Sequence, residues 1–95
     1  MANPIDEALR LGSEAEYILN SDAFKLAFAE IEEAWTSQWA SGAGKTPQER
    51  EDMFFRMQGL IAFRQKLISL LDNRRVAKDR IERDNKRAER ADRAA

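Results

Sequence analysis

From residue 48 to its C-terminal end the chain contains no proline and a single glycine, Gly59. Proline and glycine are the residues that interrupt helices most strongly. Thr46, Pro47 and Glu49 precede or open this segment in a typical helix-start pattern: a capping hydroxyl, a proline in the first turn and a capping-box acid. We therefore expect one helix from about residue 47 to about residue 90, roughly 65 Å long at 1.5 Å per residue.

Apolar residues divide this segment into two parts. Up to residue 71 they recur at helical spacing and form one continuous stripe, made of Met53, Met57, Leu60, Leu67 and Leu71 and flanked by Phe54, Ile61 and Ile68. Beyond Leu71 the apolar pattern fades, and opposite charges four residues apart replace it: Arg75 with Asp79, Arg80 with Asp84, Glu82 with Lys86, and Glu89 with Arg93. The stripe predicts packing against another helix, and the charged part predicts an overhanging helical arm.

The partner helix is expected at residues 22–40. Residues 20–22 (NSD) supply a helix cap, and the glycines at 42 and 44 end the helix. Its apolar face consists of Phe24, Phe28, Ile31, Trp35 and Trp39. These two helices predict a hairpin over residues 21–72.

The first twenty residues predict two short helices. Asn3 and Pro4 can start the first of them, Gly12 interrupts it, and Ser13 with Glu16 reads as the capping box of the second. The expected fold is therefore all-α and a single helical domain over residues 1–95. It comprises short N-terminal helices at 1–20, the hairpin at 21–72 and a charged helical arm at 73–95.

Missing residue types narrow the chemistry. The chain has no Cys and no His, so it lacks a thiolate nucleophile, an imidazole base and the usual zinc ligands. Residues 42–46 (GAGKT) resemble the end of a phosphate-binding loop, but Trp39 stands where that motif needs its first glycine. We expect no enzyme activity, no catalytic residue, no cofactor and no metal site. Without a signal peptide or a long apolar run, a cytoplasmic protein that does not enter membranes is expected.

The hairpin has more large apolar side chains than two helices can cover. Such a surplus marks an interface, so we expect a homo-oligomer or a protein partner. The residues expected to make the hairpin and subunit contacts are Phe24, Phe28, Trp35, Trp39, Phe54, Met57 and Ile61. Arg64 interrupts the stripe and is expected to pair with an acid across the hairpin or to mark an interface register. The acids Glu30, Glu32 and Glu33 are expected on a solvated face.

Charge is distributed unevenly along the chain. Residues 1–40 carry eight acids and two bases, a net charge of −6, whereas residues 73–95 carry nine bases and five acids, a net charge of +4. The basic end could contact double-stranded DNA or an acidic protein, because the guanidinium fork binds two phosphate oxygens at once. The candidate contacts are Arg74, Arg75, Arg83, Arg87 and Arg90. A freestanding charged helix used as a coiled-coil or docking arm is the alternative.

Four segments carry a resemblance to a known group of proteins: residues 15–28 (AEYILNSDAFKLAF), 31–39, 49–51 and 60–67. They resemble small helical proteins from the DNA-packaging and head-morphogenesis genes of tailed bacteriophages. The resemblance implies a role like that of the small terminase subunit, whose relatives build rings from helical hairpins and recruit DNA to the packaging motor. The chain departs from that plan because residues 4–20 predict no helix-turn-helix, so the resemblance implies no sequence-specific DNA recognition and no site residues.

The sequence thus predicts a phage-type assembly protein, a small-terminase-like oligomer that supports DNA packaging in the host cytoplasm. The large terminase or another phage or host protein would be its partner. Two alternatives stay open. The acidic N-terminal part could belong to a small phage inhibitor that blocks a host nucleic-acid enzyme by imitating nucleic-acid charge, or the chain could be a scaffolding or head–tail adaptor protein.

Overall fold

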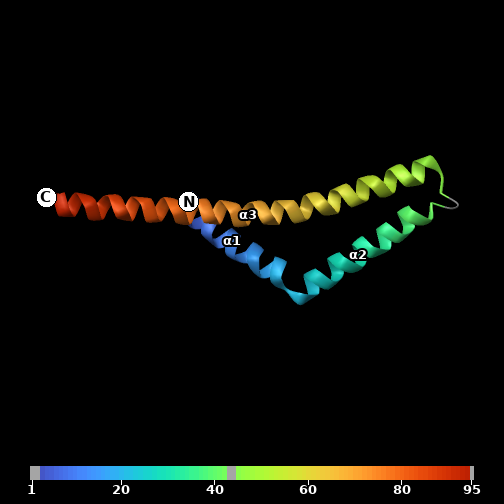
Figure 1. Ribbon diagram of the computed structural model, residues 1–95, viewed down its shortest axis with the longest axis horizontal. Coiled ribbons are helices and arrows are strands. Elements are labelled where there is room, and N and C mark those ends of the chain that lie inside the picture. The colour runs from blue at the N-terminus through green and yellow to red at the C-terminus, as the bar shows by residue number, and fades with distance from the viewer. Residues whose placement is uncertain (1–2, 43–44, 95) are drawn as a thin grey trace. The chain divides into compact units, whose positions relative to one another are not determined.

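A computed structural model describes residues 3–42 and 45–94, and all the regular structure in these ranges is helical. The helices are α1 (Pro4–Asn20), α2 (Asp22–Ser41) and α3 (Pro47–Ala94) (Figure 1). The first half of α3 packs against α2, and a later part of α3 packs against α1. The expected all-α fold with one long C-terminal helix is confirmed. The chain divides into two compact units, one formed by residues 17–66 and the other by residues 1–16 with 67–95.

The helix ends lie where the capping residues predict them. Asn3 accepts a hydrogen bond from the backbone N–H of Ile5 at 2.9 Å, and Ser21 Oγ accepts one from Phe24 N–H at 3.2 Å. Thr46 Oγ1 accepts from Glu49 N–H at 3.2 Å. Gly42 ends α2 in the left-handed conformation, with φ of 53°. Gly44, the second expected helix stop, lies outside the described residues.

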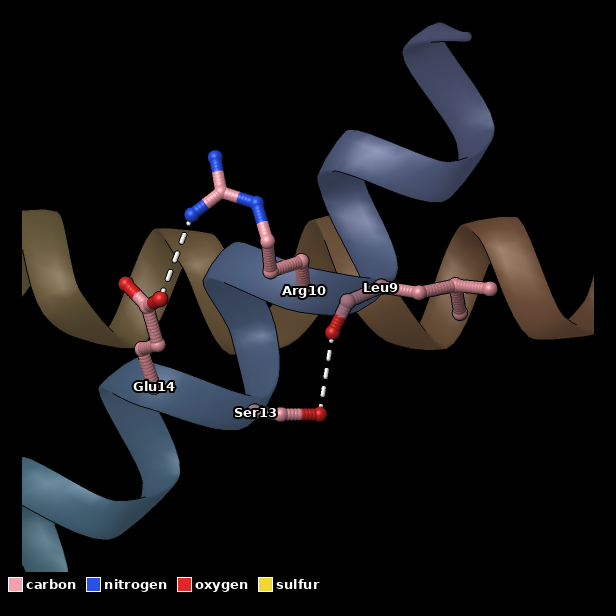
Figure 2. A network of polar contacts seen from close by, with 4 residues as sticks. All are labelled: Leu9, Arg10, Ser13 and Glu14. Carbon is pink, nitrogen blue, oxygen red and sulfur yellow. Dashed lines mark hydrogen bonds and ion pairs between the residues drawn. The ribbon is translucent and has the colours of Figure 1, made fainter. Parts of the chain in front are cut away.

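The expected break at Gly12 is wrong, because α1 is one helix through this residue. Ser13 does not act as a cap either: its hydroxyl donates to the carbonyl of Leu9 at 2.9 Å (Figure 2). Arg10 and Glu14 form an ion pair at 3.1 Å one turn apart on the same helix (Figure 2). The reason for the glycine is tertiary, since Gly12 is buried against α3.

In the unit formed by residues 1–16 and 67–95, α1 presents a ridge of small side chains to α3. Gly12 and Ala15 are buried, and Ala8 is half-buried on the same side of the helix. Opposite them, Leu67 and Ala77 of α3 are 8% and 7% exposed. The expected arm at 73–95 therefore has a packing partner over its first turns. Every side chain of residues 82–93 is exposed, so the overhang begins after Ile81.

The buried side of α3 repeats every seven residues, the period of helices that supercoil around a partner. Met53, Leu60, Leu67, Arg74 and Ile81 hold these positions, and all five are buried or half-buried. Arg74 is the charged member of an otherwise apolar series. It lies where Gly12 provides space on α1: a Cβ at position 12 would overlap the Cβ of Arg74 and stand 2.9 Å from its Cδ.

Candidate functional site

The unit formed by residues 17–66 contains most of the predicted hairpin, and its interior is centred on Phe28. Its side chain is 8% exposed, and its ring centroid lies 5.8 Å from that of Phe24. The Arg64 guanidinium lies over the Phe28 ring, 5.0 Å from the centroid. Of the two alternatives expected for Arg64, its contact across the hairpin is with an aromatic face and not with an acid, because a ring face attracts a cation electrostatically. The other alternative, an interface register, stays a prediction.

The predicted interface residues separate into an inner and an outer group. Phe24, Phe28, Trp35 and Met57 are buried or half-buried inside the hairpin. Trp39, Phe54 and Ile61 are 51%, 46% and 44% exposed, so they lie on its surface. The outer group is the part of the prediction that leaves apolar surface available to another molecule.

Phe55 and Phe63 extend this outer surface and were not among the predicted interface residues. They are 60% and 56% exposed, and the Phe55 ring packs edge-on against Phe54 at 5.9 Å. At about 100° per residue, Phe54 and Ile61 flank one side of the buried stripe, Phe63 flanks the other side, and Phe55 lies nearly opposite the stripe. Residues 53–63 are thus apolar on nearly every side, a property of helices that are buried in an assembly.

The turn of the hairpin holds the lysine and threonine that resembled a phosphate-binding loop. Lys45 Nζ lies 4.0 Å from Met53 Sδ, and Thr46 caps α3. A shallow depression beside them mixes cations and carboxylates, with Lys45, Glu49, Asp52 and Arg56 among its lining residues. Thr46 of the apparent motif therefore serves the helix start, and residues 43–44 of the motif lie outside the described part of the chain.

Four of the basic residues of α3 form a stripe on one face of its C-terminal segment. Val76, Arg80, Arg83, Asp84 and Arg87 line one shallow depression. Arg90 follows at the same helical spacing, so arginines recur at intervals of three, four and three residues. We call Arg80, Arg83, Arg87 and Arg90 the arginine stripe. It spans about 15 Å along the helix, within an arc of about 80°.

Acidic residues are arranged around this stripe in an ordered way. Asp79 and Asp84 flank it, whereas Glu82, Glu89 and Asp92 fall on the opposite side of the helix. Glu82 is held there by Lys86 at 3.3 Å, the one of the four predicted charge pairs that is in ion-pair contact within residues 45–94. The stripe therefore presents positive charge on one side, although the segment as a whole is mixed.

Two predicted nucleic-acid contacts lie elsewhere. The Arg74 side chain is 19% exposed, packs on Gly12 and donates to Glu16, so it belongs to the packing of α1 on α3. Arg75 is exposed but lies about 100° from the centre of the stripe. Arg80 was not among the predicted contacts. The sequence feature that could have identified it is the spacing of the arginines along the helix rather than their number.

The remaining titratable groups offer no second site. Glu30, Glu32 and Glu33 are exposed on α2, as expected of a solvated face. Within residues 3–42 and 45–94, no three acidic side chains are placed to hold a metal ion. In the same ranges, no helix combines the length and apolar character required to cross a bilayer.

Comparisons with known proteins add no relative. No model of a known protein family matches the chain, and no characterised protein or solved structure is significantly similar to it.

Proposed function

We propose that this chain is a non-enzymatic assembly protein, a small-terminase-like oligomer that supports viral DNA packaging in the host cytoplasm. Its hairpin self-associates, and its C-terminal helix holds duplex DNA. The observation that carries the proposal is the arginine stripe, whose four side chains are exposed among residues 3–42 and 45–94. The large terminase, or another phage or host protein, is the proposed partner of the assembly.

Arginine on one helix face suits the phosphate backbone, because each guanidinium can bind two oxygens and each contact releases counterions. Four such residues in one copy give weak, sequence-independent binding. Several copies held in one assembly add their contacts, since the second and later contacts form at high effective concentration. Self-association through the exposed apolar residues of the hairpin therefore supports the DNA-binding role.

The test compares two triple variants with the same change in charge. Arg80, Arg83 and Arg87 are changed to Gln in the first, and Arg75, Lys78 and Arg93 in the second. All six side chains are exposed, so both variants should fold. The affinity for a duplex is measured from about 50 to 200 mM salt, where each phosphate contact contributes about 0.9 to the log–log slope.

The stripe variant is expected to lose most of the binding and to show a slope smaller by about 3. The control variant should retain most of the wild-type affinity for the duplex and most of the wild-type salt slope. Equal losses in the two variants would mean that net charge, and not the stripe, attracts DNA. A wild-type chain that does not bind a duplex at 50 mM salt would refute the DNA-binding role.

A scaffolding or adaptor role is the second candidate, and the exposed apolar flanks of the hairpin favour it. In that case the assembly forms but its stability does not depend on the arginine stripe or on DNA. An inhibitor that imitates nucleic acid would use the exposed acids of α2 instead. Replacing Glu30, Glu32 and Glu33 by Gln would then abolish capture of a single host enzyme without affecting the oligomer.

A further inference from the structure

Gly59 is unexplained by the packing of its own hairpin. It lies within α3, where glycine is less favourable than any residue except proline. A Cβ at this position would meet no atom within 4 Å, so α2 does not require a glycine here. Phe55 and Phe63 stand one turn before and one turn after it, 60% and 56% exposed. The glycine is thus the centre of an exposed aromatic surface.

The charges on this side of α3 are arranged about the same centre. Asp52 precedes Gly59 by seven residues, and Lys66 follows it by seven. With Phe55 and Phe63 at four residues on either side, the five positions fall within an arc of about 80°. All five residues are exposed. We call Asp52, Phe55, Gly59, Phe63 and Lys66 the Gly59 face.

We propose that the Gly59 face binds the Gly59 face of a second copy, with the two α3 helices antiparallel and a two-fold axis at Gly59. This inference rests on the proposed function, in which the chain self-associates, and it identifies the surface that does so. In such a pair, every residue a given number of positions before Gly59 meets the residue the same number of positions after it. Phe55 then packs on Phe63 of the second copy, and Asp52 pairs with its Lys66, each contact occurring twice.

The charges select the antiparallel direction. A parallel pair would place Asp52 against Asp52 and Lys66 against Lys66, which is repulsive. The glycines at the axis allow the backbones to approach at the short end of the usual 8–10 Å interaxial range. A shallow crossing of about 20° keeps Asp52 and Lys66, about 10 Å along the helix from the axis, within reach of each other.

The first experiment reverses the charges in the full chain. Asp52→Lys and Lys66→Asp are prepared singly and together, with Glu30→Lys on α2 as the control. Dimer dissociation constants are measured by sedimentation at low salt. Each single reversal should raise the constant about tenfold, which corresponds to about 1.4 kcal/mol. In the double variant the dimer dissociation constant should return to within about threefold of the wild-type value. The Glu30→Lys control should leave the constant unchanged.

The second experiment tests the close approach at the glycine. Gly59→Leu adds a side chain that has open space within its own hairpin, so the variant should fold with at least wild-type helix content. It should nevertheless lose the dimer, because the two leucines would hold the helices apart. Gln58→Leu adds the same side chain about 100° away and should associate as wild type.

Cross-linking tests the relative direction of the two α3 helices. The chain has no native cysteine, so only the introduced cysteines react with a thiol reagent. A mixture of the Asp52→Cys and Lys66→Cys variants should cross-link with a short thiol reagent, whereas either variant alone should not. Cross-linking of each variant with itself would show a parallel pair and overturn the proposal.

The outcomes separate this inference from the proposed function. If all variants associate like wild type, the Gly59 face is not the interface, and the assembly role stands on another surface. If the reversals behave as expected but the dimer binds no DNA, the face is established and the DNA-binding role fails. A wild-type chain that stays monomeric at about 0.1 mM, a concentration well above a typical micromolar constant, overturns the face.

Discussion

Replacing Gly12 by alanine should destabilise the protein, although alanine is the better helix former. In the interior of a helix this substitution normally gains about 1 kcal/mol. Here the added Cβ would overlap the Cβ of Arg74 and lie 3.0 Å from its Cγ and 2.9 Å from its Cδ. Because both Cβ atoms are fixed to helical backbone, the overlap can be relieved only by moving α1 away from α3.

The size of the effect follows from two opposing terms. Forcing one extra carbon into a closely packed contact costs about 1–3 kcal/mol. A shift of α1 would also loosen the contacts of Ala15, which is 1% exposed, and of Ala77, which is 7% exposed. Set against the gain of about 1 kcal/mol in helix propensity, these costs leave an expected net loss of up to about 2 kcal/mol.

Gly59 provides the matched control, because it is also a helical glycine but has nothing within 4 Å of its Cβ position. Gly59→Ala should therefore gain up to about 1 kcal/mol. Urea denaturation followed by circular dichroism measures both variants, at a protein concentration where sedimentation shows only the monomer, so that the proposed contact at Gly59 does not contribute. For a domain of this size, 1 kcal/mol corresponds to a shift in Tm of about 4–8 °C.

A third variant locates the overlap. Arg74→Ala keeps the Cβ, so combining it with Gly12→Ala should not restore stability. If Gly12→Ala raises Tm as Gly59→Ala does, the close approach of α1 to α3 is not present in solution. If Arg74→Ala rescues Gly12→Ala, the overlap was with the flexible part of the arginine side chain.

Three further substitutions test other contacts. Phe28→Ala should lower the free energy of unfolding in urea by about 3 kcal/mol, because the ring is 8% exposed. Phe54→Ala should lower it by less than about 1 kcal/mol, and equal losses in the two variants would contradict the assigned core. Thr46→Ala should lower the free energy of unfolding by about 1 kcal/mol because the α3 cap is lost, whereas Thr46→Ser keeps the capping hydroxyl and should not. Equal decreases of Tm in the two variants would argue against the cap. Glu16→Gln should lower the free energy of unfolding by at most about 1 kcal/mol, because the Glu16 side chain in its ion pair with Arg74 is half exposed. This difference from wild type should disappear near 1 M salt, which screens the ion pair. A loss that does not depend on salt would show that the ion pair is not its cause.

The helix ends could be predicted because they depend on atoms that are close in sequence. Ser21 and Thr46 each cap a helix through an N–H three residues later, and Gly42 ends α2 through its own backbone conformation. The apolar period of α2 and of the first half of α3 is equally local. These features therefore led directly to the all-α fold and the hairpin.

The N-terminal part could not be predicted in this way. The pattern of Ser13 and Glu16 satisfies a capping box on paper, but the glycine before it has a different role. Gly12 provides space for Arg74, which is more than sixty residues away in sequence. No local pattern contains that information, because the need for a glycine arises only when two helices pack together.

The arginines of the candidate site were likewise only partly predictable from the sequence. The sequence indicated a basic end, but not which of its guanidinium groups the fold uses internally. Arg74, one of the predicted contacts, instead packs on Gly12 and pairs with Glu16. Arg80 becomes a member of the stripe because its side chain is exposed and lines the same depression as Arg83 and Arg87. Exposure decides which cations remain available to a partner, and exposure is a property of the packed structure.

The ends of α2, the start and approximate length of α3, and the place where positive charge accumulates all follow from the sequence. These follow from propensity, capping and spacing, which act over a few residues. Tertiary structure alone decided that α1 is one helix, that the first turns of the arm are covered, and which arginines and phenylalanines face outward. Those outcomes depend on contacts between distant segments, because a side chain is buried or free only when another helix has been placed against it.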